Sequence, residues 1–291
     1  FVLQGYQKRA LAVADWLVAL GRETGHRLPV RLVKGAYWDS EIKHAQEQGL
    51  ADYPVFTRKC HSDLAYEQCA ARLLDAPDAI YPQFATHNAH TVAVVRALAG
   101  DKAFEFQRLH GMGQLLYDEL QDEDPALPVR VYAPVGNHRD LLPYLVRRLL
   151  ENGANSSFVN RFLDARVPPE ELLRDPLAEA EQLPGWRHTR IPVPRQLYSG
   201  EALPWANARG IDLADPGTLA TLQAAMAAGV AQPHRAGPIV GGRELPGAGR
   251  AVHNPAAPEF VVGEVLEADA GAVDAALAAA SAAQPGWDAA G

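Results

Sequence analysis

Residues 79–110 read AIYPQFATHNAHTVAVVRALAGDKAFEFQRLH, an apolar run, an amphipathic stretch and a second apolar run. Runs of consecutive apolar residues this short are typical of strands buried on both faces, whereas the middle stretch has helical spacing. The unit therefore predicts two parallel strands joined by a crossover helix.

The same alternation extends in both directions over the first 166 residues. Short β-branched or aromatic runs predict strands at 1–5, 30–36, 79–86, 104–110 and 129–133. Amphipathic stretches predict helices at 7–20, 40–47, 64–74, 90–98, 114–119 and 141–151, with Gly21 and Gly153 ending the first and the last. The fold class is therefore α/β. No G-x-G-x-x-G follows a strand, which disfavours a Rossmann-type sheet.

Five strands are too few to close a (β/α)8 barrel. An open set of parallel strands would leave an exposed edge at 1–5, and such edges are prone to aggregation. We therefore expect a partial TIM-type barrel consisting of its last five strands, with three more strands upstream of this sequence. The chain also begins inside an apolar run, at Phe1, rather than with a methionine.

The character of the chain changes after residue 166. Prolines interrupt residues 167–204, and 218–228 is the helix predicted beyond them. A Gly/Pro-rich stretch at 237–249 precedes a predicted strand at 261–266 and an alanine-rich helix at 270–283. These features predict a linker region at 167–249, followed by a separate segment at 250–291.

The composition narrows the classes of function. The chain is 48% hydrophobic and 21% charged, so it can bury a core. Its net charge of −8 argues against binding to duplex nucleic acid, whose phosphates must be neutralised. No apolar run is long enough to span a membrane, and we recognise no secretion signal. The two cysteines, Cys60 and Cys69, cannot form a disulfide framework and are typical of a reducing compartment.

The last helix of the α/β region carries an unusual group of side chains. Tyr144, Arg147 and Arg148 lie at i, i+3 and i+4, so they share one face. A carboxylate between the two guanidinium groups would receive bidentate, charge-assisted hydrogen bonds, although a solvated surface is the other interpretation. Because the helix follows the last strand, its first turn opens where barrel enzymes keep their sites, which favours anion binding.

Polar and aromatic side chains follow the other strands. Trp38 either stacks on a bound ring or packs in the core. Thr86 and Asn88 either cap the next helix or join His87 in hydrogen bonds to a cofactor. His87 and His90 have a spacing seen in metal sites, but no third ligand follows, so we expect no metal.

The common motifs for covalent or acid–base chemistry are not found at the strand ends. We recognise no G-x-S-x-G elbow, no P-loop and no paired catalytic carboxylates there. The side chains that do gather are arginines, tyrosines, tryptophan and amides. Such a set suits a cofactor that carries the chemistry itself.

Several of these motifs resemble the proline utilization A (PutA) family of bifunctional flavoenzymes. Residues 1–166 resemble the C-terminal part of its proline dehydrogenase barrel through QGYQKR at 4–9, RLVKGAYWDS at 31–40, YPQFATHNAH at 81–90, LHGMG at 109–113, YAPVG at 132–136 and YLVRRLLENGAN at 144–155. Residues 250–291 resemble the start of the family's aldehyde dehydrogenase domain, through HNPAAP at 253–258, GEV at 263–265 and the alanine-rich helix.

The resemblance implies FAD-dependent oxidation of L-proline to 1-pyrroline-5-carboxylate by hydride transfer to the flavin. A longer parent protein would then oxidise glutamate semialdehyde to glutamate with NAD, at a site outside this chain. The family further implies a membrane quinone as electron acceptor, a homo-oligomeric parent, no nucleic-acid contact from this segment, and a cytoplasmic location with peripheral attachment to the inner membrane. We expect the segment on its own to be inactive.

The resemblance also implies roles for individual residues. Arg147 and Arg148 would clamp the proline carboxylate, and the substrate pocket would be completed by Tyr37, Leu109, Tyr132 and Tyr144. Arg31 and Tyr132 are the implied catalytic residues, with Arg31 supplying positive charge that stabilises reduced flavin. The implied flavin contacts are Gln4, Arg31, Val33, Gly35, Ala36, Trp38, Thr57, Lys59, Thr86, His87, Asn88, Gln107 and Glu151.

Two other interpretations stay open at this point. One is a non-catalytic barrel that binds a ligand without turnover. The other is a different TIM-barrel flavoenzyme, or an amino-acid lyase, that uses the same carboxylate clamp. The presence of Tyr132, Tyr144, Arg147 and Arg148 together argues against the non-catalytic barrel.

Overall fold

The computed structural model describes residues 1–153, 168, 174–200, 203–204 and 208–290. Its contacts divide the chain into two compact units, Phe1–Ile211 and Asp212–Gly291. Within the described residues, no helix is both long enough and apolar enough to cross a membrane.

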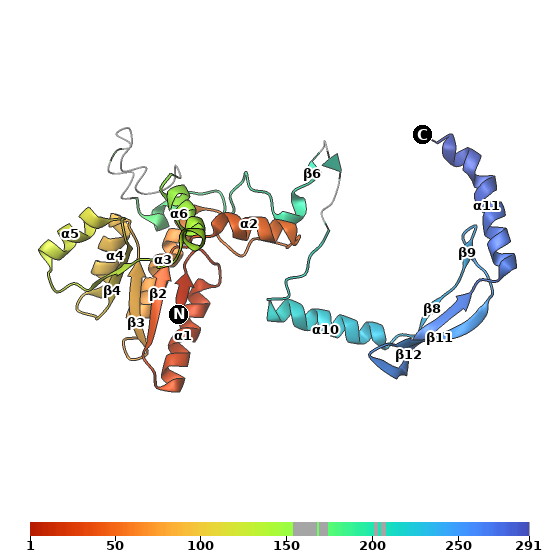
Figure 1. The fold of residues 1–291 in the computed structure, drawn as a ribbon, viewed down its shortest axis with the longest axis horizontal. Coiled ribbons are helices and arrows are strands. Elements are labelled where there is room, and N and C mark those ends of the chain that lie inside the picture. The colour runs from red at the N-terminus through yellow and green to blue at the C-terminus, as the bar shows by residue number, and fades with distance from the viewer. Residues whose placement is uncertain (154–167, 169–173, 201–202, 205–207, 291) are drawn as a thin grey trace. The chain divides into compact units, whose positions relative to one another are not determined.

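The first unit is built on a parallel sheet with strand order β1-β2-β3-β4-β5 (Figure 1). The strands are β1 (Val2–Gln4), β2 (Leu28–Val33), β3 (Ile80–Ala85), β4 (Glu105–Leu109) and β5 (Val129–Tyr132). The helices that connect and follow them are α1 (Ala10–Thr24), α2 (Trp38–Glu47), α3 (Lys59–Leu74), α4 (Ala89–Ala99), α5 (Gln114–Glu123) and α6 (His138–Gly153). Each strand pairs with the next along the chain, as in part of a (β/α)8 barrel, which confirms the predicted fold class.

Alternation along the strands decides which side chains form the core. Leu32 of β2 and Phe84 of β3 are fully buried beneath the helices, where they belong to one cluster with Leu17 of α1 and Tyr66 of α3. Each such side chain contributes roughly 1.5 to 3 kcal/mol by leaving water. The alternate side chains, such as Arg31, point to the opposite face of the sheet and leave that face polar.

Two boundaries differ from the predictions because of glycines. Gly21 does not end α1 but lies buried inside it. A glycine is needed there, because a β-carbon would come within 2.8 Å of the Ala79 carbonyl oxygen. Gly25, with φ of 67°, ends the helix instead. Strand β2 stops at Val33 rather than at residue 36, because Gly35 turns the chain with φ of 137° and a β-carbon there would strike the Tyr6 ring.

Part of the proline-rich region packs on the α/β unit. Helix α9 (Pro176–Glu181) was not predicted, because Pro176 was interpreted as an interruption, whereas it occupies the first turn behind the capping side chain of Asp175. The following segment reaches the loop between α2 and α3, where Tyr53 donates a hydrogen bond to the Pro192 carbonyl oxygen at 2.8 Å. The remaining elements of this region are η1 (Pro194–Gln196), β6 (Ser199–Gly200) and β7 (Leu203–Pro204).

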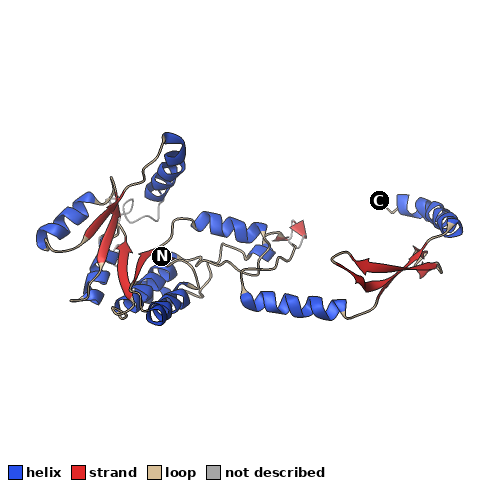
Figure 2. Ribbon diagram, turned by 60° about the horizontal axis from the view of Figure 1, so that its bottom comes forward, coloured by secondary structure: helices blue, strands red, loops and turns tan. Residues whose placement is uncertain are grey.

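The second unit consists of a helix, a three-stranded sheet with a separate two-stranded sheet, and a final helix (Figure 2). Its elements are α10 (Pro216–Val230), β8 (His234–Ala236), β9 (Ile239–Val240), β10 (Arg243–Glu244), β11 (Ala248–Asn254), β12 (Ala257–Glu267) and α11 (Ala270–Asp288). Strand β12 pairs antiparallel with β11 and parallel with β8, so the predicted boundary between residues 249 and 250 falls inside this unit. Among its described residues, the buried hydrophobic side chains are Leu266 and Ala272.

Candidate active site

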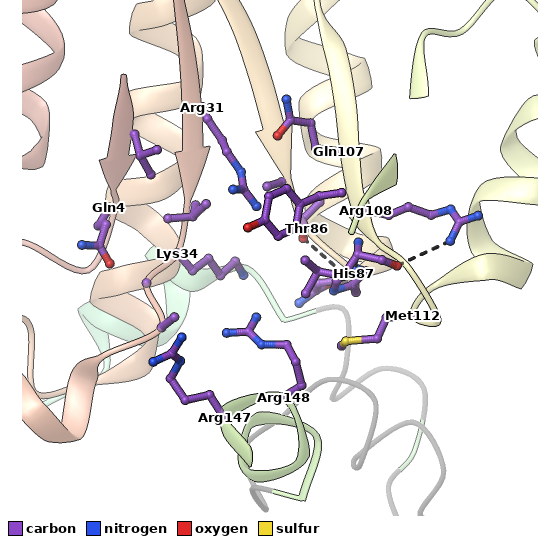
Figure 3. A pocket seen from close by; sticks show the side chains of 18 of the residues that line it. Gln4, Arg31, Lys34, Thr86, His87, Gln107, Arg108, Met112, Arg147 and Arg148 are labelled. Atoms are coloured by element: carbon purple, nitrogen blue, oxygen red, sulfur yellow. Dashed lines mark hydrogen bonds between the residues drawn. The ribbon is translucent and has the colours of Figure 1, made fainter. Parts of the chain in front are cut away.

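A cavity of about 660 Å³ opens at the carboxyl ends of the strands (Figure 3). These ends meet at one edge of a parallel sheet, which brings residues from distant parts of the sequence together. The lining residues are Val2, Gln4, Arg31, Val33, Lys34, Gly35, Ala36, Tyr37, Lys59, Ala85, Thr86, His87, Asn88, Gln107, Arg108, Leu109, Met112, Tyr132, Tyr144, Arg147 and Arg148.

Helix α6 contributes Tyr144, Arg147 and Arg148 to the cavity wall. Figure 3 shows both arginine side chains rising from this helix toward the strand ends. Arg147 lies over the Tyr37 ring, 5.1 Å from its centroid, and Arg148 lies over the Tyr144 ring at 5.3 Å. An aromatic face attracts a cation without neutralising its charge, so the stacking holds the guanidinium groups in place and leaves them cationic.

A third arginine–tyrosine contact connects the sheet to the same group. Arg31 of β2 lies over the Tyr132 ring at 5.3 Å, and the Tyr132 and Tyr144 rings are 6.3 Å apart with an angle of 47° between their planes. The Nε atoms of Arg31 and Arg147 are buried and have no hydrogen-bond partner within the described part of the chain. A buried donor of this kind costs about 1 to 3 kcal/mol unless an acceptor reaches it.

The cavity is strongly cationic. It is lined by six basic side chains, Arg31, Lys34, Lys59, Arg108, Arg147 and Arg148, and by no aspartate or glutamate among the residues that the structure describes. One carboxylate lies just behind the lining: Asp63 accepts hydrogen bonds from Lys34 and Lys59, each at 2.5 Å. Burial lowers the pKa of Lys34, and Asp63 opposes that effect. The excess of positive charge favours an anionic ligand.

His87 lies in the cavity wall as a neutral imidazole. The Leu109 backbone N–H donates to its Nε2 at 3.1 Å, which places the ring proton on Nδ1. Burial lowers the pKa of His87, and the charges of Arg148, Arg108 and Arg31 lower it in the same direction, so that it falls to about 4. Gly113 allows this close packing, because a β-carbon there would lie 2.8 Å from the His87 ring.

Most of the residues predicted for the site line the cavity, whereas Trp38 and Thr57 do not. The Trp38 indole N–H instead donates to the Phe56 carbonyl oxygen at 2.8 Å, and the Thr57 hydroxyl accepts from the His188 backbone N–H at 3.0 Å. Both residues are therefore engaged in the loop between α2 and α3. The Glu151 side chain lies outside the described residues. Their contacts with a flavin stay predictions.

The cavity also contains residues that were not predicted for it. Val2 and Ala85 follow from strand alternation, because they share the inner face with Gln4 and Gln83. Lys34 lies inside the RLVKGAYWDS motif, between the predicted residues Val33 and Gly35. Arg108 and Met112 gave no signal beyond their place at the end of β4 and in the turn after it.

The match to a known family covers the α/β region. A family model described as proline dehydrogenase matches residues 1–161. The bifunctional protein PutA of Salmonella typhimurium is 48% identical to this chain over 99% of its length. The match takes up 23% of that relative, so this chain spans about a quarter of the length of the relatives it matches.

Solved structures show the same likeness. A crystal structure of PutA from Bradyrhizobium japonicum, the D779W variant, has a TM-score of 0.72 and 53% identity, covering 78% of this chain and 23% of that one. PutA from Bdellovibrio bacteriovorus, solved after inactivation by N-propargylglycine, has a TM-score of 0.76 and 31% identity. That match covers 98% of this chain and 29% of the Bdellovibrio protein.

Proposed function

Since this chain belongs to the proline dehydrogenase family, as its match over residues 1–161 shows, we propose that its cavity binds FAD and oxidises L-proline to 1-pyrroline-5-carboxylate. The observation that carries the proposal is the position of Arg147 and Arg148, side by side at a cavity lined by tyrosines and no described carboxylate. Two neighbouring guanidinium groups in such a place suit a carboxylate ligand, which both can bind with charge-assisted hydrogen bonds.

The residues present suit a flavin dinucleotide. The buried Nε atom of Arg31 would gain an acceptor, and the cationic lining would balance the phosphates and the negative charge of a reduced flavin. Amide side chains at Gln4, Asn88 and Gln107 would add hydrogen bonds to the cofactor. When bound, FAD supplies the hydride acceptor that these side chains lack.

The protein's own contribution is binding, orientation and exclusion of water. Oxidation removes a hydride from the ring carbon beside the nitrogen and a proton from the nitrogen, and it leaves a C=N bond. Arg147 and Arg148 would fix the substrate by its carboxylate, while Tyr37, Leu109, Tyr132 and Tyr144 would enclose the ring. Holding a substrate in one reactive orientation can lower the activation barrier by several kcal/mol.

The wider organisation follows the same proposal. Residues 1–166 would form the C-terminal part of the proline dehydrogenase barrel, and residues 167–249 would be a linker region. Residues 250–291 would begin an NAD-dependent aldehyde dehydrogenase domain. The support is the 48% identity to PutA over nearly the whole chain, which extends past the family match at residue 161. A quinone acceptor, a homo-oligomeric parent and the inactivity of this segment alone belong to the same proposal.

The decisive experiment is an anaerobic absorbance titration of the protein that carries this sequence. We expect a bound-flavin spectrum that proline bleaches and other amino acids do not. A flavin bleached by a different amino acid would identify another flavoenzyme with the same carboxylate clamp. A protein that binds proline but no flavin would be a non-catalytic barrel, and the proposal would be wrong.

A further inference from the structure

A buried carboxylate lies one layer beneath the cavity. The Glu105 side chain is 4% exposed and accepts two hydrogen bonds from Arg130, at 2.7 and 2.9 Å. Its Oε1 atom also accepts from the amide nitrogens of Gln83 and Gln107, both at 2.7 Å. The Arg130 guanidinium lowers the pKa of Glu105, so the group is an ionised acceptor at neutral pH.

Gln107 connects this layer to the cavity. Glu105 and Gln107 are two residues apart on β4, so both point to the inner face of the sheet, and Gln107 alone of the two lines the cavity. An ionised carboxylate can only accept hydrogen bonds, so Gln107 must present its NH2 group to Glu105. Its carbonyl oxygen then points the other way, and Figure 3 shows that oxygen on the side of Arg31.

Three other side-chain acceptors at the mouth of the sheet, where the carboxyl ends of the strands open into the cavity, each already accept a backbone hydrogen bond. Thr86 Oγ1 accepts from the Asn88 backbone N–H, Asn88 Oδ1 accepts from that of Thr91, and His87 Nε2 accepts from that of Leu109. The carbonyl oxygen of Gln107 accepts no hydrogen bond from the residues that the structure describes. In a cavity dominated by cationic donors, it is an acceptor on β4 that a ligand N–H can use.

We propose that Glu105 is a positioning residue, which orients the Gln107 amide so that its carbonyl oxygen accepts the N3–H group of the flavin ring. This inference rests on the proposed flavin site. The oxidised isoalloxazine ring has one N–H group, at N3, and its other polar ring atoms are acceptors. An amide turned the other way would set its NH2 group against that N–H and lose the hydrogen bond.

The test compares FAD with its N3-methylated analogue, which lacks this hydrogen. Apoprotein is prepared from the wild type and from Glu105→Gln, Gln107→Leu and Gln83→Leu variants, and the Kd of each flavin is measured by fluorescence quenching. We expect the wild type to bind 3-methyl-FAD about tenfold more weakly than FAD, since one hydrogen bond to a neutral group is worth about 1 to 1.5 kcal/mol.

The ratio of the two Kd values is the readout, because general damage to the fold weakens both flavins alike. Glu105→Gln and Gln107→Leu should each bring the ratio close to one, by different routes. Gln83→Leu removes the other amide that binds Glu105 but lies outside the cavity lining, so its ratio should match the wild type.

Two results would overturn the inference in distinguishable ways. If FAD binds and proline bleaches it, but the ratio is the same in the wild type and all variants, the assignment of Glu105 is wrong and the proposed function stands. If the wild-type protein binds neither flavin, the proposed function fails and the inference fails with it.

Discussion

The mouth of the sheet and the layer beneath it hold arginines in opposite ways. At the mouth, Arg31, Arg147 and Arg148 lie over tyrosine rings, and no described aspartate or glutamate lines the cavity. One layer down, Arg130 forms a bidentate ion pair with a carboxylate that is almost fully buried. Both arrangements fix the guanidinium group in place.

The difference concerns the charge that remains available. A guanidinium group stacked on an aromatic ring keeps its positive charge and its donors, whereas in Arg130 the charge is balanced by a carboxylate that also engages two of the donors. The mouth is therefore suited to binding an anion, and the layer beneath it to holding the strands and the Gln107 amide in position. Substitutions in the two layers should accordingly have different kinds of effect.

The largest expected effect comes from the mouth. Arg148→Lys should raise the KM for proline by about 100-fold, because a point charge cannot replace the bidentate fork and about 2.7 kcal/mol of binding is lost. Steady-state kinetics of the flavin-loaded protein measure it. Arg96→Lys is the matched control, because Arg96 pairs with Glu123 on the exposed side of the helices and should leave KM unchanged. An unchanged KM in Arg148→Lys would show that Arg148 does not bind the substrate carboxylate.

The layer beneath should respond in stability. Glu105→Leu should lower the free energy of unfolding by about 2 kcal/mol, because the amide donors of Gln83 and Gln107 lose their buried acceptor. Denaturant unfolding followed by circular dichroism measures the change. The exposed pair of Asp75 and Lys102 provides the control, and Asp75→Asn should cost less than about 0.5 kcal/mol. Equal losses in the two variants would contradict a special role for the buried layer.

The neutral His87 should make stability depend on pH in a defined window. Its pKa is lowered to about 4 in the folded protein, so between about pH 6.5 and pH 4 the unfolded chain binds a proton that the folded chain does not. His87 therefore makes the free energy of unfolding fall as the pH falls through that window, by at most about 1.4 kcal/mol per pH unit. His87→Gln should flatten the dependence there. The same slope in both proteins would mean that His87 is not held neutral.

The smallest expected effect comes from the tyrosine wall. Tyr144→Ser opens space beside Tyr132 and Arg148, so the preference for proline over hydroxyproline, as a ratio of kcat/KM values, should fall by about fivefold. Leu115→Ser, at an exposed position on α5, is a control that should leave the ratio alone. An unchanged preference in Tyr144→Ser would mean that Tyr144 does not contact the substrate ring.

The parts of the molecule that could be predicted are those with local causes. Short runs of consecutive apolar residues, separated by stretches with helical spacing, were enough to predict the five strands. The i, i+3, i+4 relation of Tyr144, Arg147 and Arg148 was enough to put them on one face. The end of α1 was harder to predict, because Gly21 and Gly25 differ in the packing around them and not in a recognisable pattern of neighbouring residues. Only the neighbouring Ala79 shows why Gly21 stays inside the helix.

What could not be predicted depends on pairing between distant elements. Glu105 meets Arg130 and Gln83 because of the register of three strands, and no single stretch of sequence records that register. Trp38 and Thr57 were predicted at the flavin, but partners in the loop between α2 and α3 and in the proline-rich segment engage them. The roles of the cavity residues toward proline and FAD still depend on the experiments above.

The packing of the proline-rich segment has a consequence for how the protein is made. The loop that carries Thr57 and leads to Lys59 is secured by residues synthesised much later, since Arg58 donates to the Arg187 carbonyl oxygen 129 positions further along the chain. At a translation rate of roughly 5 to 20 residues per second, that interval lasts on the order of ten seconds. During this time the strands of the nascent sheet can already pair, but the loop before Lys59 lacks its contact with Arg187 until that residue has been synthesised.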